Sequence, residues 1–536
     1  MAGDIGGGLR GRFSRVVDVF RGADVEDGPY RPAEHGPLAR FDGAPGREVE
    51  RYWLNAPYAF AVITYDDAEN EHRYYVAEPP LDGFRGELLE RVVEDIRDPL
   101  LYRADDPTEE GVVREELTAL LEQYGVDVTP ETYHTLVYYL LRDFRGYGKV
   151  DPLMHDPNVE DISCDGYDLP IFVYHDEYTD VETDVSFDEE GLDSYVVKLA
   201  QRSGRHISVG DPVVGTTLPN GSRAELALGE EVTPRGSAFT LRLYAEDPFT
   251  PIDLIDYGTF NVEQMAYLWL CIEHNKSLIF AGGTASGKTT SMNAVSMFVP
   301  PRAKVLSIED TRELALYHDN WLSSVTRERL HEGADIDMYD LLRSALRHRP
   351  EFIIVGEVRG EEAITLFQAM NTGHTTFSTM HADSIETAIN RLENEPIGVP
   401  RAMVQSLDLM LVQTLTRFDG ERVRRSRAIG EIGGVDGRTG ELDYSRAFSW
   451  DPADDAFDRG DSNLLDEIQT ERGWSRAELR REFGRREQFL AALRDQGVRD
   501  YRRFTALVNE YYTDADRVMA RLTDDRTPDT TLVGEP

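Results

Sequence analysis

Short apolar runs that stop abruptly at polar residues are the most regular feature of the middle of the chain. They occupy residues 278–281, 305–308 and 352–355, and each is followed directly by a glycine or a carboxylate. Largely apolar runs of this length predict strands that are buried on both faces, as in a parallel sheet. Residues 289–298, which follow the first run after a glycine-rich turn, have the pattern of a helix. The middle of the chain is therefore expected to be an α/β domain.

The first half of the chain mixes shorter β-rich and helical stretches. Residues 58–76 contain two β-rich runs around a polar turn, which predicts a hairpin. Helices are predicted at 109–124 and 130–144. Two strand-like segments and one helix follow, at 171–174, 239–244 and 192–202 respectively. These stretches predict an α+β unit and then a second α/β domain.

After residue 451 the chain becomes heavily charged and has helical patterns at 464–470, 476–494 and 500–511, which predict a small helical appendage. The expected parts are an arm at 1–45, an α+β subdomain at 46–128, an α/β domain at 129–247, a linker at 248–256, the nucleotide domain at 257–450 and the helical region at 451–536.

The net charge of the chain limits the kinds of partner that are expected. The 536-residue chain has a formal net charge of -42, and Arg supplies nearly all of its 57 basic residues. Nucleic-acid affinity comes largely from clustered cations that release counterions, so a nucleic-acid partner is not expected. Such charge also repels itself at low salt and is screened at molar salt. We therefore expect a salt-rich cytoplasm, and hence a halophile.

The two cysteines, Cys164 and Cys271, lie far apart in the sequence, so neither a disulfide framework nor a zinc site is supported. No apolar stretch approaches the length of a membrane span, and the N-terminus has no signal-peptide core. A cytoplasmic protein is expected.

The turn after the first apolar run carries the sharpest motif. Gly282 to Thr289 reads GGTASGKT and fits the GxxxxGK[ST] pattern of a phosphate-binding loop between a strand and a helix. In such a loop, main-chain N–H groups and a helix N-terminus surround the phosphates of a nucleotide. The residues expected to contact ATP are Gly282, Gly283, Thr284, Ala285, Ser286, Gly287, Lys288, Thr289 and Thr290.

Three further stretches add candidate chemistry. The second apolar run ends in the carboxylates of IEDTRE, and the third ends in Gly356-Glu357, where most such ATPases have Asp-Glu. A fourth strand-like stretch has His374 and His381 near its ends. The carboxyl ends of parallel strands are where ligands bind, so these groups are expected around the nucleotide. Taken singly, each stretch could equally be a core strand and a turn.

In this order and spacing, the four stretches resemble the Walker A, aspartate, Walker B and histidine boxes of the secretion traffic ATPase superfamily. That superfamily includes the ATPases of type II and type IV secretion, type IV pili and the archaeal archaellum. The resemblance covers residues 130–520, and VDPLMHDPNVEDISCDG and WDPADDAF in the flanks are similar to its archaeal branch. It implies a RecA-like P-loop α/β core preceded by a smaller α/β domain.

The resemblance also implies roles for individual residues. Lys288 would hold the β and γ phosphates and the Thr289 hydroxyl would bind Mg²⁺. Glu357 would orient the metal shell or the attacking water, and Glu313 would be the general base. His374 and His381 would sense the γ phosphate or a neighbouring subunit, although each could instead be a satisfied core histidine.

An arginine on the transferring phosphoryl group is expected from the domain before the core. Arg223 and Arg242 are the candidates, with Arg205 as a further one. The alternative is that these arginines form surface ion pairs.

By resemblance, the chain is expected to form a hexamer at the cytoplasmic face of the membrane. There it would drive assembly of pilin-like subunits into a pilus or archaellum, or secretion, through a polytopic platform protein. A hinge at residues 248–251 is a further expectation. The N-terminal arm is expected to be a basic amphipathic helix that lies on lipid or on its own protein, or else to be flexible and partly disordered. The alternative function is a RecA-like nucleic-acid motor or recombinase.

Overall fold

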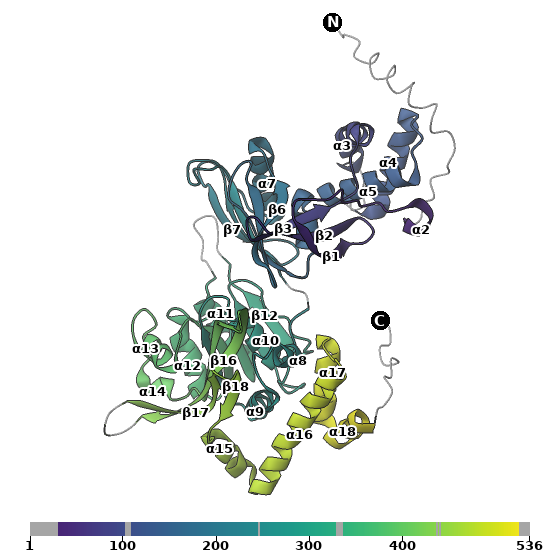
Figure 1. Ribbon diagram of the computed structural model, residues 1–536. Helices are drawn as coiled ribbons and strands as arrows, with labels where there is room; N and C mark the ends of the chain where they lie inside the picture. The colour runs from purple at the N-terminus through teal and green to yellow at the C-terminus, as the bar shows by residue number, and fades with distance from the viewer. Residues whose placement is uncertain are drawn as a thin grey trace. The chain divides into compact units, whose positions relative to one another are not determined.

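The structure is a computed structural model, and it describes residues 30–101, 109–244, 247–327, 336–435, 438 and 441–524. The chain forms two compact units, Met1–Tyr244 and Ala245–Pro536 (Figure 1). The predicted amphipathic helix falls within residues 1–29 and lies outside the described residues.

The first unit is built on a mixed sheet. Its described strands run in the order β1-β2-β3-β6-β5-β4-β9-β8-β7. They are β1 (Arg47–Asn55), β2 (Ala59–Asp66), β3 (Glu71–Ala77), β4 (Val159–Cys164), β5 (Pro170–His175), β6 (Thr179–Ser186), β7 (Val213–Thr217), β8 (Arg223–Ala227) and β9 (Ala238–Arg242). The helices are α2 (Pro32–His35), α3 (Gly83–Leu101), α4 (Glu110–Tyr124), α5 (Pro130–Phe144), α6 (Asp151–Met154) and α7 (Glu189–Arg202), with a 3₁₀ turn at Gly148–Val150.

Both regions predicted before residue 247 contribute to this one sheet. β3 pairs in parallel with β6 through Arg73↔Glu182 and Tyr74↔Thr183. Buried Asp156 accepts hydrogen bonds from the hydroxyls of Tyr52 (2.6 Å) and Tyr74 (2.7 Å), which adds a polar tie between the strands. The predicted limit at residue 128 falls between α4 and α5, whose apolar faces share a core.

The second unit holds another sheet, in the order β12-β11-β13-β14-β10-β15-β16-β17-β18 among the described strands. Its parallel part runs from β12 to β15, and β16–β18 continue it as an antiparallel meander. The strands are β10 (Leu278–Gly282), β11 (Val305–Glu309), β12 (Trp321–Val325), β13 (Phe352–Val355), β14 (Thr375–Met380), β15 (Leu409–Phe418), β16 (Glu421–Val435), β17 (Leu442–Asp451) and β18 (Ala456–Arg459).

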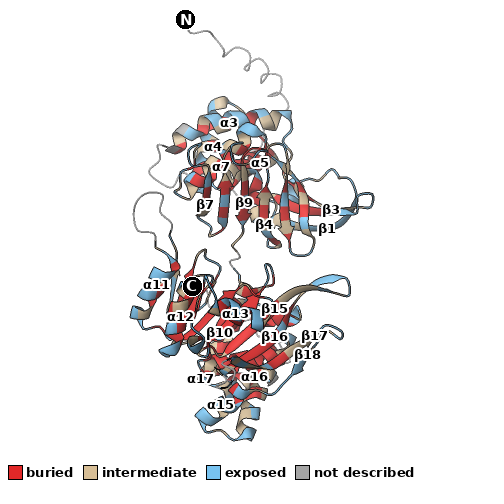
Figure 2. Ribbon diagram, turned by 90° about the vertical axis from the view of Figure 1, so that its left-hand side faces the viewer, coloured by how far each residue is buried: buried red, intermediate tan, exposed pale blue. Residues whose placement is uncertain are grey.

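Helices cover both faces of this sheet, so its central strands are buried (Figure 2). Alternate strand residues enter the two cores: Leu278 and Phe280 face one, Ile279 and Ala281 the other. The first core is closed by α8 (Pro251–Asp256), α9 (Val262–Glu273), α10 (Lys288–Ser296), α15 (Asn463–Arg472), α16 (Arg476–Asp495), α17 (Tyr501–Thr513) and α18 (Ala515–Asp524). The second is closed by α11 (Met338–Ala345), α12 (Glu362–Asn371), α13 (Ile385–Glu393) and α14 (Arg401–Val404), and a 3₁₀ turn at Leu346–His348 follows α11.

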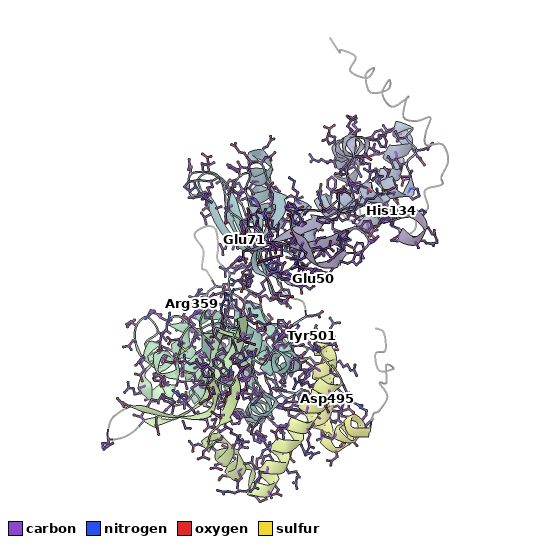
Figure 3. All side chains as sticks on the ribbon, in the orientation of Figure 1. Glu50, Glu71, His134, Arg359, Asp495 and Tyr501 are labelled. Atoms are coloured by element: carbon purple, nitrogen blue, oxygen red, sulfur yellow. The ribbon has the colours of Figure 1, made fainter. Side chains whose placement is uncertain are left out.

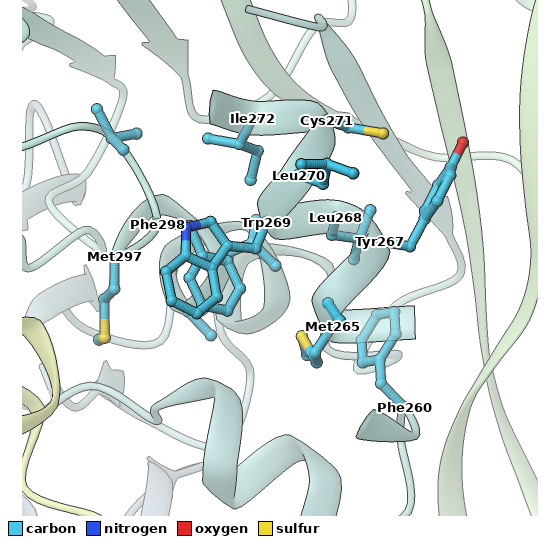
Figure 4. Close-up of a cluster of buried hydrophobic side chains, with 14 of the residues drawn as sticks. Phe260, Met265, Tyr267, Leu268, Trp269, Leu270, Cys271, Ile272, Met297 and Phe298 are labelled. Carbon is cyan, nitrogen blue, oxygen red and sulfur yellow. The ribbon is translucent and has the colours of Figure 1, made fainter. Parts of the chain in front are cut away.

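The C-terminal helices belong to the core of the second unit. Trp269 of α9 is fully buried and stacks on Phe298 at a centroid distance of 5.1 Å (Figure 4). Phe489 of α16 and Tyr511 of α17 pack against the same indole at 5.3 and 4.7 Å. The region expected as an appendage therefore shares a core with the nucleotide domain, because its helices carry apolar side chains among their charges.

The sequence predicted most local elements correctly. The hairpin at 58–76, the helices at 109–124, 130–144 and 192–202, and the three C-terminal helices are confirmed. Two local expectations were wrong. Residues 251–256 form α8, with Thr250 and Asp253 as its capping box, instead of linker. Residues 456–459 form β18, paired with the end of β17, before the helices begin.

Buried Arg486 on α16 joins these helices to α9. Its guanidinium bonds the Glu273 carboxylate and lies 5.4 Å from the ring centroids of both Trp269 and Tyr511. We expect Arg486→Ala to lower the free energy of unfolding of the second unit by about 3–5 kcal/mol, since it leaves Glu273 without its cation. Denaturant unfolding measures this. Arg481→Ala, on the same helix with 63% of its side chain exposed, should change stability by less than about 0.5 kcal/mol. Equal effects of the two variants would show that the contacts of Arg486 with Glu273 and the two aromatic rings do not stabilise the second unit.

Candidate nucleotide-binding site

The predicted phosphate loop joins the buried end of β10 to the start of α10. Gly287 has φ 85° and precedes the helix without a side-chain cap, so the first N–H groups of α10 are directed at the loop. Ala285 also has positive φ, at 57°. At Gly282 a Cβ would lie 2.4 Å from Ser286 Oγ and 2.7 Å from the Gln413 carbonyl oxygen, so only glycine fits there. The local sequence thus dictates a tight loop with exposed main-chain donors.

Lys288 folds back over this loop. Its ammonium donates a hydrogen bond to the Gly283 carbonyl oxygen at 2.7 Å, and 9% of the residue is exposed. Burial lowers the pKa of Lys288, while the nearby carboxylates of Glu357 and Glu313 act in the opposite direction. The cation and both predicted carboxylates are therefore close enough to interact electrostatically.

The strand register explains why these groups meet. β11, β13, β14 and β10 are parallel neighbours, so their carboxyl ends lie on one edge of the sheet. That edge carries Glu309, Glu357, His381 and the loop that starts at Gly282. This is the edge at which α/β sheets bind ligands.

Two pairs of polar side chains are in contact at this edge. His381 Nε2 lies 3.2 Å from Glu357 Oε1. Asp310 accepts a hydrogen bond from Arg359 at 2.5 Å and one from Thr326 Oγ1 at 3.1 Å. Arg359 is labelled in Figure 3 on the second unit. The segments after β11 and β13 are thereby linked side chain to side chain.

His374 is not brought to the site. It precedes β14, whereas His381 follows it, so the length of a six-residue strand separates them. The His374 ring nitrogen Nδ1 lies 3.2 Å from Thr372 Oγ1 and 3.3 Å from the Ala369 carbonyl oxygen. Within this unit, His374 contacts the end of α12 at the opposite edge of the sheet.

The candidate arginines lie in the first unit. Arg223 of β8 and Arg242 of β9 are register partners, so both point to the same face of the sheet. Arg223 contacts Glu225 at 2.9 Å and Arg242 contacts Asp161 at 3.1 Å. Arg205 follows α7, away from both strands in the sequence.

Arg424 was missed by the sequence analysis, whereas Glu309 was expected at this edge as one of the IEDTRE carboxylates but was given no role. Arg424 of β16 donates from Nε to the Ala285 carbonyl oxygen at 3.0 Å, so a strand more than a hundred residues away supports the loop. Glu309 lies buried at the end of β11 and accepts two main-chain N–H groups. Nothing local to Arg424 in the sequence points to the loop.

A pocket opens beside the loop, and it is formed by the start of the P-loop together with the segment after β14 and α13. It is lined by Gly282, Gly283, His381, Ala382, Asp383, Thr387 and Arg391.

Thr289 and Glu357 fit the expected Mg²⁺ ion. Mg²⁺ commonly binds through one or two protein oxygens together with substrate phosphates and water. Thr289 comes directly after Lys288 in α10. The Glu357 carboxylate interacts electrostatically with the Lys288 ammonium, so both oxygen ligands belong to the surroundings of Lys288. Within the described ranges, no group of three or more His, Cys, Asp or Glu side chains could hold a metal ion. Of the helices that the structure describes, none has the length and apolarity needed to cross a bilayer.

A glycine-rich loop between a buried parallel strand and a helix, with carboxylates at the same sheet edge, defines a P-loop nucleotide-binding protein. The chain belongs to the type II/IV secretion system protein family, whose pattern matches residues 196–450. Residues 7–80 match the family described as PilB3-like, N-terminal, and residues 453–530 match PilB3-like, C-terminal. The predicted family is confirmed.

The chain is also similar to individual proteins. The type IV secretion system protein PtlH of Bordetella pertussis is 30% identical over 44% of this chain and 78% of its own length. The uncharacterized protein MJ0900 of Methanocaldococcus jannaschii is 39% identical over 64% of this chain, and the match spans 63% of that protein. Among solved structures, the pilus retraction motor PilT with bound ADP is 19% identical and covers 69% of this chain and 94% of its own, with a TM-score of 0.36.

Paired glycines test the geometry of the loop. We expect Gly282→Ala to destabilise the second unit by about 1–3 kcal/mol, because the new methyl group overlaps Ser286 and the Gln413 carbonyl. Gly283→Ala is the matched control, since its Cβ would meet no atom within 4 Å. Thermal unfolding without nucleotide measures the difference. Equal melting temperatures for the two variants would show that the loop has another conformation.

Proposed function

We propose that the protein hydrolyses ATP at the P-loop edge of the second unit. The observation that carries this proposal is the position of Lys288, whose pKa responds to burial and to the carboxylates of Glu357 and Glu313. A cation for the phosphates and carboxylates for the water and the metal are the parts that phosphoryl transfer needs. The family assignment supports the same reaction.

The proposed roles follow from these positions. The N–H groups of the loop and of α10 bind the phosphates, and the Lys288 ammonium exchanges the Gly283 carbonyl for phosphate oxygens. The Glu313 carboxylate accepts the proton of the attacking water. Glu357, held by His381, orients the water or the metal shell. Thr289 and Glu357 would hold Mg²⁺, which would supply positive charge to the phosphate oxygens when bound.

For the work done with this energy, we propose assembly of a type IV pilus-like filament, as an archaeal pilus or archaellum motor. PilB3-like sequence on both flanks of the secretion domain supports this choice. The expected assembly is a hexamer at the cytoplasmic face of the membrane, coupled to a polytopic platform protein, in a salt-rich cytoplasm. The hinge near residue 248, and the domain limits apart from the two corrected by α8 and β18, remain predictions of this proposal.

A nucleic-acid motor is the second candidate, because it uses the same loop. The net charge of -42 opposes it, since binding would require clustered cations. ATP turnover measured with single-stranded DNA and with anionic vesicles separates the two. Stimulation by DNA alone would favour the second candidate.

Substitutions of two carboxylates, Glu313 and Glu357, test the proposed hydrolysis directly. We expect Glu313→Gln to lower kcat by about 10²–10⁴-fold, because an amide cannot accept the proton. Glu357→Gln should lower it as well, with nucleotide binding retained. Phosphate release in molar KCl with Mg²⁺ measures both. Glu351→Gln is the matched control, since this carboxylate lies at the other end of β13. Full turnover in both active-edge variants would refute the proposed roles.

The arginine pair gives a separate test. If Arg223 and Arg242 act on the nucleotide, from their own chain or a neighbour in a ring, Arg→Ala at both should reduce turnover more than threefold. Arg51→Ala is a control from the same sheet, because Arg51 has the same 46% side-chain exposure as Arg223 and also pairs with a glutamate. Turnover within threefold of wild type in the double variant would exclude this role.

A further inference from the structure

Glu309 is an unusual residue for the end of a buried strand. Only 1% of it is exposed, and the one cation that acts on its carboxyl group electrostatically among the described residues is Arg312. One oxygen, Oε1, accepts hydrogen bonds from the main-chain N–H groups of Glu313 and Leu314, each at 2.9 Å. The other oxygen, Oε2, is buried without a hydrogen-bond partner in the described part of the chain. Burying a carboxyl group in this way costs free energy, so a specific reason is needed.

The turn that Glu309 holds leads to the proposed general base. Leu314, at the far end of the turn, is fully buried in the core of the second unit. Asp310, at the near end, is fixed by Arg359 and Thr326. The main chain of Glu313 lies between Asp310 and Leu314, and its N–H group donates to Glu309 Oε1. The orientation of the Glu313 side chain therefore depends on a contact made by the Glu309 carboxyl.

Gly356 lies beside the Glu309 side chain. β13 is the parallel neighbour of β11, and the Gly356 N–H group donates to the Ile308 carbonyl at 2.9 Å. A Cβ at position 356 would lie 3.5 Å from Glu309 Cγ. A carboxylate on that Cβ would stand beside Glu309, where most P-loop ATPases have the Walker B aspartate. Burial already raises the pKa of Glu309 to about 7, and a second carboxylate would oppose its ionisation further.

We propose that Glu309 is a positioning residue that sets the orientation of Glu313, and that Gly356 keeps a second carboxylate away from the Glu309 side chain. The inference rests on the proposed ATP hydrolysis. In this arrangement the Glu309 carboxyl group holds the turn that carries the general base, and Thr289 and Glu357 are the residues that would bind the metal.

The test compares three variants. Glu309→Ala removes the acceptor of both N–H groups, whereas Glu309→Gln keeps an oxygen in the same place. Asp408→Ala is the matched control, because Asp408 is another carboxyl with raised pKa that accepts a main-chain N–H group, from Ser277 at 2.7 Å. It precedes β15 at the opposite edge of the sheet. Should Glu309→Ala fail to fold, Glu309→Asp replaces it, since its side chain is one methylene shorter.

Two readouts are expected to change together. Hydrogen exchange of the amides of residues 313 and 314 should accelerate at least tenfold in Glu309→Ala and stay within threefold of wild type in Glu309→Gln. The kcat for ATP should fall at least tenfold in Glu309→Ala, with KM and the Kd for a non-hydrolysable ATP analogue within threefold. Glu309→Gln should keep kcat within about threefold. Asp408→Ala should lower the melting temperature without either change.

Several results would overturn the inference. Unchanged exchange at residues 313 and 314 in Glu309→Ala would show that the contact does not hold the turn. Faster exchange with full kcat would show that the turn does not orient the base. A kcat loss in Asp408→Ala as large as that in Glu309→Ala would reduce the effect to general destabilisation. An absence of turnover in the wild type would refute the proposed function instead, and the exchange comparison would still test the positioning contact.

Discussion

The parallel register of β11, β13, β14 and β10 is the constraint on which the site depends. Parallel strands end on the same side, so four segments from residues 282 to 381 deliver their polar groups to one edge. A shift of one residue in any strand would exchange its two faces and move its last residue away from that edge. The apolar residues that alternate between the two cores hold the register, because slipping would move them to the wrong side.

Both helical layers are needed to maintain this register. One layer is formed by α11–α14, which lie between and after the strands that carry the site. The other combines α8–α10 with helices from the C-terminal end of the chain, which meet around Trp269. Figure 4 shows buried side chains of the layer formed by α8–α10 and the C-terminal helices, around α9 and Phe298. The charged C-terminal helices thus stabilise the sheet from one of its two faces.

How much the sequence could predict depends on the distance over which each feature is determined. The P-loop and its flanking strand and helix are local, so residues 278–298 were predicted well. Glu309 and Gly356 are in contact only because β11 and β13 are neighbours in the sheet. The sequence of neither segment predicts this order of strands. The separation of His374 from His381 could have been anticipated, since seven residues of extended chain span roughly 20 Å. The core role of the last helices was hidden because a buried arginine, Arg486, interrupts their apolar pattern.

An acidic chain that binds a polyanion must supply positive potential from sources other than many basic side chains. In this site Lys288 faces the carboxylates of Glu313 and Glu357, so side chains alone give little net positive charge. The N–H groups of the loop and the N-terminus of α10 add partial charge that does not titrate. Their orientation is fixed by packing: Gly282 is confined by Ser286 and Gln413, and the Ala285 carbonyl is held by Arg424. The conformation of the main chain, more than the number of cations, is therefore what suits this edge to the proposed binding of phosphates.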